Sequence, residues 1–355
     1  MDHITSYFLS GYSYDEILTT LSSIHGVDIS MRQLHRKLRS LGLYRRGHHD
    51  SINVIINAIN TELQGSGSDF GHRLMHQKLR SKRYTIDRES VQIALKFLDP
   101  NGVESRTSHR FRRRKYMSKG PIQTWHIDGY DKLKPFGLAI HGAIDGYSRK
   151  ILWLHVGASN NNPEVIGSLF LSTVKELQII PRCIRCDRGS ENVIVGGIQR
   201  YFRRNHMDET SGQRSFRYGP STRLCENTPF DPSLTYHVEC LRFCFIGLIQ
   251  TELDETAKLW NNHSIRKSKN SECPPGKPNV LFFSPEIQNS SSYGMPLSDN
   301  DYQIAKHFVI EPTLFGCTDE VAELVTIVAK DNNIDKIENV SVAKHLFLLT
   351  IQELQ

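Results

Sequence analysis

The sequence lacks any long apolar stretch. No run approaches the roughly 20 apolar residues that a membrane-spanning helix requires, and so we expect no membrane partner. The first residues, Met1-Asp2-His3-Ile4, also lack the basic and apolar segments of a secretory signal peptide. With 355 residues, of which 38% are hydrophobic, the chain is expected to fold inside a cell into two or three domains.

Cysteine is absent from the first half of the chain. All seven cysteines lie at or after Cys183, and without an export signal we expect them to be reduced. Cys183 and Cys186 have the spacing of a zinc-binding pair, but no second pair matches it. Both cysteines also sit within an apolar run, which favours a buried strand over a zinc site.

Acidic residues are scarce at the beginning of the chain. Residues 1–120 contain 20 Lys/Arg and 11 Asp/Glu, a net charge of +9, which leaves 44 − 20 = 24 basic and 38 − 11 = 27 acidic residues for the remainder. A positive N-terminal part favours a polyanion as partner, and the more acidic remainder favours cations.

Residues 1–50 are predicted to form a helix-turn-helix. Residues 14–21 have apolar positions at helical spacing after Ser13, and Ser30 can cap a second helix at residues 31–41. The predicted turn between them is His25-Gly26-Val27. Leu34, Leu38 and Leu41 would form the apolar face of the second helix.

The opposite face of this second helix is basic. It carries four residues predicted to bind DNA: Arg32, Arg36, Lys37 and Arg39. A basic second helix after a glycine turn is typical of a recognition helix in the major groove. An ordinary helical hairpin with a solvated basic face is the alternative.

Residues 51–119 are predicted to form a second helix-turn-helix followed by a basic linker. Helices are expected at 52–63 and 73–79, separated by a flexible Gly65-Ser66-Gly67-Ser68 segment. Asp87 or Ser90 would cap a third helix that runs through Phe97, and Pro100-Asn101-Gly102 would close the module.

The linker contains a dense basic run. Its members predicted to bind DNA are Arg110, Arg112, Arg113 and Arg114. The run could act as a nuclear localisation signal, as a segment that grips phosphates, or as a merely solvated linker.

Three blocks beyond residue 120 share one pattern. Residues 125–130, 142–150 and 184–192 each show a short apolar run that ends on a carboxylate, followed by a turn former. This pattern indicates buried strands that deliver Asp128 and Asp187 to the end of a sheet, 187 − 128 = 59 positions apart. One such Asp is usually a turn residue or a helix cap. Two of them in a basic protein favour a metal site.

Two neighbouring residues have other expected roles. Asp145 would open a second strand, 151–156, as a turn or structural residue. His126 lies two positions before Asp128 and hence on the same strand face. It could reach a phosphate, but a packed or hydrogen-bonded histidine is favoured.

The remaining segments alternate between helix and strand. Helices are predicted at 164–177, 198–204, 236–260 and 319–330, a further helix would end at residues 346–349, and residues 288–300 look like a linker. The helix at 198–204 would expose three arginines toward DNA: Arg200, Arg203 and Arg204. The helical tail, 287–355, has no assigned role, and a homo-oligomer contact is one possibility.

The three blocks resemble the catalytic core of the retroviral integrase and DDE transposase superfamily, and they are most similar to integrase-core proteins of animal genomes. The resemblance covers residues 120–286. It implies an α/β, ribonuclease H-like core with a mixed sheet flanked by helices, preceded by the all-α helix-turn-helix modules. It also implies a transposon-derived nuclear protein that performs metal-dependent DNA strand transfer. Two Asp and one Glu would hold Mg²⁺ or Mn²⁺, with Asp128 and Asp187 as the two aspartates.

The third carboxylate departs from the family pattern. In the family a Glu follows a G-P-S-T stretch on a Trp-rich helix, whereas here Gly219-Pro220-Ser221-Thr222 precedes Glu226 in a segment with two nearby prolines. Proline disfavours helix at the residue before it, so Glu226 would lie on a loop. A segment near 223–236 therefore looks incomplete, and a catalytically inactive DNA-binding relic is the alternative function.

Overall fold

The computed structural model describes residues 3–45, 49–108, 116–218, 235–269, 271–313 and 315–353. Its internal contacts define two units. The helical unit comprises residues 1–121, 147–150 and 258–291, and the sheet unit comprises residues 122–146, 151–257 and 292–355. Within the described ranges, no helix is both long and apolar enough to cross a membrane. The predicted domain bounds stay a prediction.

The helical unit begins with three helices, α1 (His3–Leu9), α2 (Tyr14–His25) and α3 (Met31–Ser40). Ser13 and Ser30 each form a capping box with the residue three positions later, and Gly26 ends α2 with φ 62°. The short α1 was not predicted. Leu41, predicted on the apolar face of α3, is 45% exposed because it lies just past the helix end. Apolar side chains from all three helices form one core: Ile4, Phe8, Ile17, Leu21, Leu34 and Leu38.

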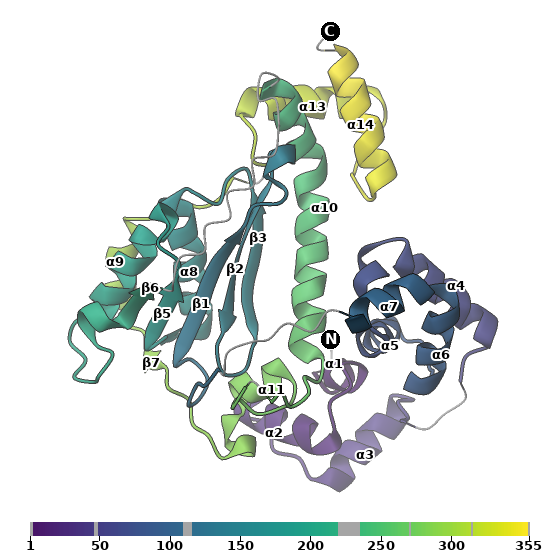
Figure 1. Cartoon of the computed structure of the whole chain (residues 1–355), viewed down its shortest axis with the longest axis vertical. Helices are drawn as coiled ribbons and strands as arrows, with labels where there is room; N and C mark the ends of the chain where they lie inside the picture. The colour runs from purple at the N-terminus through teal and green to yellow at the C-terminus, as the bar shows by residue number, and fades with distance from the viewer. Residues whose placement is uncertain are drawn as a thin grey trace. The chain divides into compact units, whose positions relative to one another are not determined.

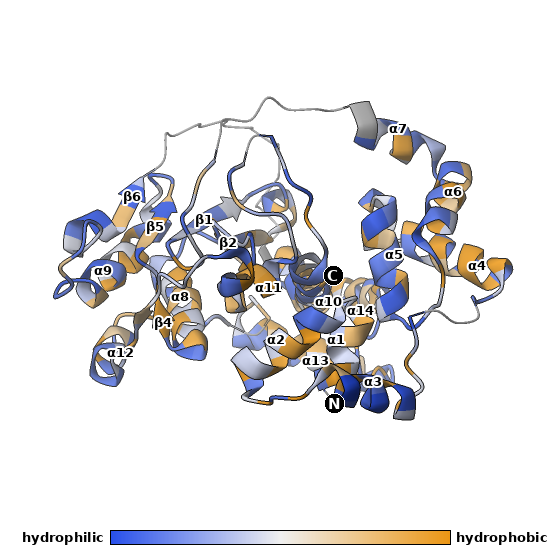
Figure 2. Cartoon of the chain, turned by 90° about the horizontal axis from the view of Figure 1, so that it is seen from below, coloured by the Kyte–Doolittle hydropathy of each residue, from blue (hydrophilic) through white to orange (hydrophobic). Residues whose placement is uncertain are grey.

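A second helical group follows, with α4 (Ile52–Leu63), α5 (His72–Ser81), α6 (Arg88–Leu98) and α7 (Pro100–Ser108). Asp87, rather than Ser90, caps α6, since its side chain accepts a hydrogen bond from the Ser90 N–H at 2.8 Å. Figure 2 colours α4 mostly orange and α3 and α5 mostly blue, as their sequences require. Buried side chains of α4, α5 and α6 form the core: Ile55, Ile59, Met75, Leu79, Val91 and Leu95.

Two local predictions in this group are wrong. Residues 65–68 were expected to be flexible, but a 3-10 helix, η1 (Ser66–Asp69), forms there. Gly67 is buried so tightly that an added Cβ would lie 2.7 Å from the Glu62 carbonyl oxygen. Pro100 does not close the module but begins α7, because proline is compatible with the first turn of a helix.

The sheet unit contains a mixed five-stranded sheet, β1 (Thr124–Tyr130), β2 (Ala139–Asp145), β3 (Ile151–Gly157), β5 (Cys183–Cys186) and β6 (Phe216–Tyr218), in the order β3-β2-β1-β5-β6 (Figure 1). The first three strands are antiparallel, and β5 and β6 run parallel to β1. Asp145 does not open a strand but ends β2, where it is fully buried and accepts a hydrogen bond from the Ile122 N–H at 2.7 Å.

Helices flank this sheet. In α8 (Pro163–Leu177), Phe170 meets the Trp125 ring edge to face at 6.1 Å, and α9 (Val193–Phe202) contacts α8. The predicted long helix is confirmed as α10 (Thr235–Asn262), which runs along β3 (Figure 1). Gln250 of α10 accepts from the Val156 N–H at 3.0 Å and donates to the Leu154 carbonyl at 2.8 Å. These bonds satisfy two backbone groups of β3 at the edge of the sheet, which would otherwise be free to pair with another strand.

The C-terminal third is more structured than predicted. The helical unit adds α11 (Pro278–Phe283), and the predicted linker at 288–300 contains β7 (Met295–Pro296), which pairs with β4 (Ile179–Ile180). Then come α12 (Asp299–Lys306), α13 (Asp319–Asp331) and α14 (Val340–Glu353). Buried side chains of α13 and α14 pack against Cys240 and Cys244 in the first turns of α10. They are Val321 and Val325 of α13, and Ala343 and Leu346 of α14.

Candidate functional site

Two adjacent strands place Asp128 beside Asp187. The parallel pairing of β1 with β5 matches Thr124 to Cys183 and His126 to Arg185, an offset of 59 positions. The same offset joins Asp128 to Asp187, which directly follows the end of β5. Residues level with each other on parallel neighbours point to the same face. The separation of 59 positions between Asp128 and Asp187 therefore equals the offset between paired residues of β1 and β5.

The Asp128 carboxyl is affected by burial and by the negative charges around it. Neighbouring atoms desolvate the Asp128 carboxyl and raise its pKa, and the charges of Asp187 and Asp131 raise it further. The Gly129 N–H donates to Asp128 Oδ1 at 2.9 Å, which acts in the opposite direction. Repulsion between two carboxylates at the end of a sheet favours a bound cation.

Gly129 is required by the loop that follows. An added Cβ at this position would lie 2.6 Å from Asn160 Nδ2. Asn160 is buried and donates to Asp131 Oδ1 at 2.7 Å, while Lys134 pairs with the other Asp131 oxygen at 2.9 Å. Burial would raise the pKa of Asp131, but the bonds from Lys134 and Asn160 lower it. Asp131 is therefore engaged in holding the loop.

Glu191 is a third carboxylate near this site that the sequence reasoning missed. Burial raises its pKa, as do the charge of Asp187 and a hydrogen bond with it. Asn192 donates to both carboxylates, to Asp187 Oδ1 at 3.2 Å and to Glu191 Oε1 at 2.9 Å. A side chain at Gly189 would collide with the Glu191 carboxylate. The D-R-G-S-E-N spacing held this signal, because it places a Glu four residues after Asp187 with a glycine between them.

The donor set fits a hard divalent cation. Asp128 and Asp187 offer only oxygen ligands, which Mg²⁺ and Mn²⁺ prefer, and their mutual repulsion would be relieved by such an ion. Across the described ranges, however, no three His, Cys, Asp or Glu side chains are arranged to hold a metal ion. Glu226, the predicted third ligand, lies outside the described residues.

His126 is mostly screened from water. Burial lowers its pKa to about 4, and the charge of Arg185, its partner on β5, contributes in the same direction. A neutral, packed imidazole agrees with the favoured sequence interpretation.

The residues predicted to contact DNA have different environments. All four on α3 are exposed: Arg32, Arg36, Lys37 and Arg39. The four in the linker lie outside the described residues: Arg110, Arg112, Arg113 and Arg114.

The predicted exposure of the three arginines at the end of α9 is wrong in part. Arg203 is fully buried and pairs with Asp208. Arg204 is engaged with Asp301 at 2.9 Å, and Arg200 lies over the Phe216 ring at 5.2 Å. Each side chain has a local partner that the helical pattern alone did not indicate.

The mixed sheet flanked by helices, with Asp128 on β1 and Asp187 directly after the adjacent β5, is a ribonuclease H-like fold. Within it, residues 115–217 match the model of the integrase core domain family. The chain therefore carries an integrase core domain over this stretch, as the sequence blocks predicted, and such domains generally use divalent metals. No curated protein matches the chain.

Proposed function

We propose that the chain is an integrase-type protein that binds DNA through its helical unit and joins DNA strands weakly through its sheet unit. The observation that carries this proposal is the register of β1 and β5 in an integrase core domain: continued two residues past the His126–Arg185 pair, it puts Asp128 opposite Asp187, whose charge acts on Asp128. The substrate would be DNA ends, and the metal would be Mg²⁺ or Mn²⁺. The binding partner would be duplex DNA.

The chain's own residues would prepare the site. Asp128 and Asp187 would hold the ion, the Gly129 N–H orients Asp128 at 2.9 Å, and Asn192 orients Asp187 at 3.2 Å. When bound, such an ion polarises the scissile phosphate and favours the attacking hydroxyl. Fixed carboxylates matter because metal sites tolerate only small displacements of their ligands.

Weak activity is expected because, among the described residues, no third carboxylate joins Asp128 and Asp187 in an arrangement that could hold a metal ion. Loss of one stabilising group of about 3 kcal/mol lowers a rate by a factor of roughly 100. Glu191 is beside Asp187, but the arrangement of the described carboxylates is not that of a three-ligand site. The same observation favours a second candidate, a DNA-binding protein that has lost catalysis.

Strand transfer on pre-cut terminal DNA with Mn²⁺ distinguishes the two candidates. We expect low activity in the unmodified chain and none in Asp128→Asn, with Asp131→Asn as a control that removes a carboxylate committed to Lys134 and Asn160. Activity no higher than that of Asp128→Asn would reject strand transfer and leave the non-catalytic candidate.

The same assay assigns the third ligand. Robust activity that disappears in Glu226→Gln would contradict the expected weakness and identify Glu226 as a working ligand. Loss in Glu191→Gln instead would assign that role to Glu191. Calorimetry provides a separate check, since Mn²⁺ should bind the unmodified chain and not an Asp128→Asn/Asp187→Asn double variant.

Two further expectations belong to this proposal. Nuclear localisation would depend on the basic run that ends at Lys115, and the helical tail would offer a contact for a homo-oligomer. A transposon origin in an animal genome likewise stays a prediction.

A further inference from the structure

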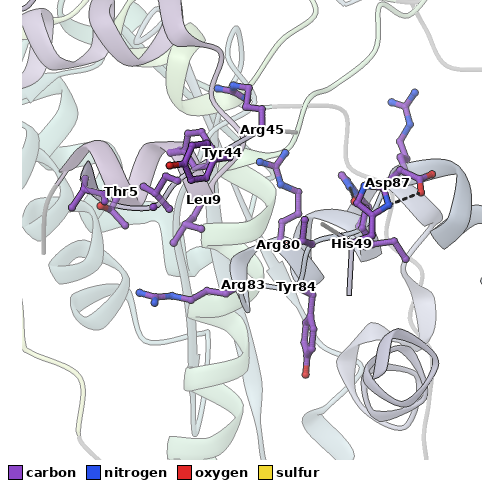
Figure 3. A pocket seen from close by; sticks show the side chains of 17 residues that line it. Thr5, Leu9, Tyr44, Arg45, His49, Arg80, Arg83, Tyr84 and Asp87 are labelled. Atoms are coloured by element: carbon purple, nitrogen blue, oxygen red, sulfur yellow. Dashed lines mark hydrogen bonds and ion pairs between the residues drawn. The ribbon is translucent and has the colours of Figure 1, made fainter. Parts of the chain in front are cut away.

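The helical unit contains a basic cavity of about 650 Å³ that lies outside the metal site. Residues of α1, the segment after α3, α5 and the segment before α6 line it. Figure 3 shows Arg45, Arg80 and Arg83 around this cavity, together with Tyr44 and Tyr84. A second cavity of about 260 Å³ shares His76, Arg80 and Arg88 with the first, and Arg73 and Lys277 also line it.

The helix that provides Arg73 and Arg80 repeats the sequence of the predicted recognition helix. α3 reads MRQLHRKLRS and α5 reads HRLMHQKLRS. Aligned end to end, Arg32 corresponds to Arg73 and Arg39 to Arg80. The α3 arginines are exposed, whereas both α5 arginines are partly buried in the walls of the cavities. Similar sequences therefore place the same charges in different environments.

The α5 arginines have no anionic partner among the described residues. No hydrogen bond or ion pair joins the guanidinium group of either residue to a carboxylate there, and the Nε–H of Arg73 is buried without a partner. Burial and the nearby Arg45 lower the pKa of Arg80. Burial, Arg266 and Arg88 lower the pKa of Arg73. A buried donor without an acceptor is costly, and crowding of like charges adds to that cost.

The acidic side chains around the cavities are already engaged. Asp87 accepts from the Ser90 N–H at 2.8 Å and pairs with His49 at 3.8 Å, as drawn in Figure 3. Glu16 pairs with Lys277 at 2.8 Å. Neither carboxylate is paired with Arg73 or Arg80. Among the described residues, the carboxylates near these cavities therefore leave Arg73 and Arg80 without an anionic partner, and an added anion could take that place.

We propose that the two cavities form a phosphate-binding cleft, in which Arg73 and Arg80 hold phosphodiester groups of duplex DNA. This inference deepens the proposed function and depends on its DNA-binding part. Arginine suits the role because its planar donors meet two phosphate oxygens at once. Tyr44 and Tyr84 add hydroxyl donors of the kind that contact phosphates and sugars. Contacts of this type fix the position of DNA without reading its sequence.

The test measures binding of the full chain to a labelled duplex by fluorescence anisotropy, with a chelator present so that catalysis plays no part. An Arg73→Gln/Arg80→Gln variant is compared with Lys330→Gln/Lys344→Gln, which removes the same charge from exposed positions on α13 and α14. We expect the arginine variant to bind about tenfold more weakly. We also expect the slope of log affinity against log salt to become less negative by about 2, because each lost phosphate contact removes about 0.9.

Folding and ligand source are checked separately. Since the substitutions relieve crowding of positive charges, the arginine variant should keep or raise its melting temperature without DNA. An affinity and salt slope equal to those of the lysine control would overturn the proposal. A second outcome would also overturn it: inorganic phosphate stabilises the unmodified chain but not the arginine variant, while both bind the duplex equally well. The cleft would then bind only a free anion. The result does not depend on strand transfer, so a failed activity assay leaves it intact.

Discussion

Arg203 shows how a single residue can depart from its sequence pattern. Its place in a basic helix predicted exposure, yet it is 0% exposed and its charge is balanced by Asp208. Burial would raise the pKa of Asp208, but hydrogen bonds from Arg203 and Thr210 lower it to about 2. A buried charge of this kind contributes little as a pair but is costly when one partner is removed.

Asp208→Asn is expected to destabilise the chain by about 3 kcal/mol, because it leaves the Arg203 guanidinium buried without a counter-charge. Asp301→Asn is the matched control, since Asp301 pairs with Arg204, whose side chain is 37% exposed. Asp301→Asn leaves the Arg204 guanidinium in contact with water and should therefore cost less, about 1 kcal/mol. Urea unfolding followed by circular dichroism measures both variants. Equal losses would show that the burial of Arg203 has no energetic consequence.

The Arg203–Asp208 pair also predicts how the free energy of unfolding depends on pH. The pKa of Asp208 is lowered from 3.8 to about 2 in the folded chain, so its stabilising contribution is present above 3.8 and is lost as the pH falls toward 2. The stability difference between the unmodified chain and Asp208→Asn should therefore shrink over that interval.

At the scale of the element, local capping signals were read correctly from the sequence. Ser30 accepts from the Gln33 N–H at 3.3 Å and its own N–H donates to Gln33 Oε1 at 2.8 Å. Ser51 occupies the equivalent position before α4, but its side chain makes no capping hydrogen bond. The two serines therefore form a natural comparison.

Ser30→Ala should lower the free energy of unfolding by about 1 kcal/mol, because the Gln33 N–H at the start of α3 loses the hydroxyl that accepts its hydrogen bond. Ser51→Ala should cost no more than a few tenths of a kcal/mol, since no cap bond is lost. Thermal unfolding of the two variants tests this. An equal loss at both positions would contradict the role assigned to the Ser30 cap.

At the scale of the whole molecule, the helical unit is discontinuous in sequence. Leu259, near the end of α10, is buried in the core formed by α4, α5 and α6, and Val280 of α11 is buried in the core formed by α1, α2 and α3. Both apolar cores are therefore completed by residues that lie beyond the integrase core match at 115–217. An N-terminal fragment alone would lack these contacts.

Leu259→Ala in the full chain should increase amide hydrogen exchange in α4, α5 and α6, because a buried Leu→Ala change costs about 2–4 kcal/mol. Val328→Ala, in the core of α13 and α14, is the control and should increase exchange there while leaving α4–α6 unchanged. Exchange resolved by peptide mass spectrometry gives the answer. No change in α4–α6 for Leu259→Ala would mean that the N-terminal helices are stable without the distant segment.

The sequence by itself determined the features that depend on neighbouring residues, above all the helices and their ends. Capping serines, glycine at the end of α2 and apolar periodicity depend on residues within one or two turns, so α2, α3, α4 and α10 were predicted close to their bounds. The blocks around Asp128 and Asp187 likewise indicated strands, and β5 does end directly before Asp187, but β1 continues two residues past Asp128. Their separation of 59 residues had meaning only once β1 and β5 were paired.

What only the tertiary structure decided depends on residues far apart in the chain. The burial of Arg203, the approach of Asn160 to Gly129 and the contact of Glu191 with Asp187 follow from how loops fold back on strands. The clearest case is α3 and α5, whose similar sequences carry equivalent arginines. Periodicity specifies which face of a helix is polar, but the neighbouring elements decide whether that face meets water or lines a cavity. Exposure depends on how the chain packs, so equivalent arginines face solvent in α3 and line a cavity in α5.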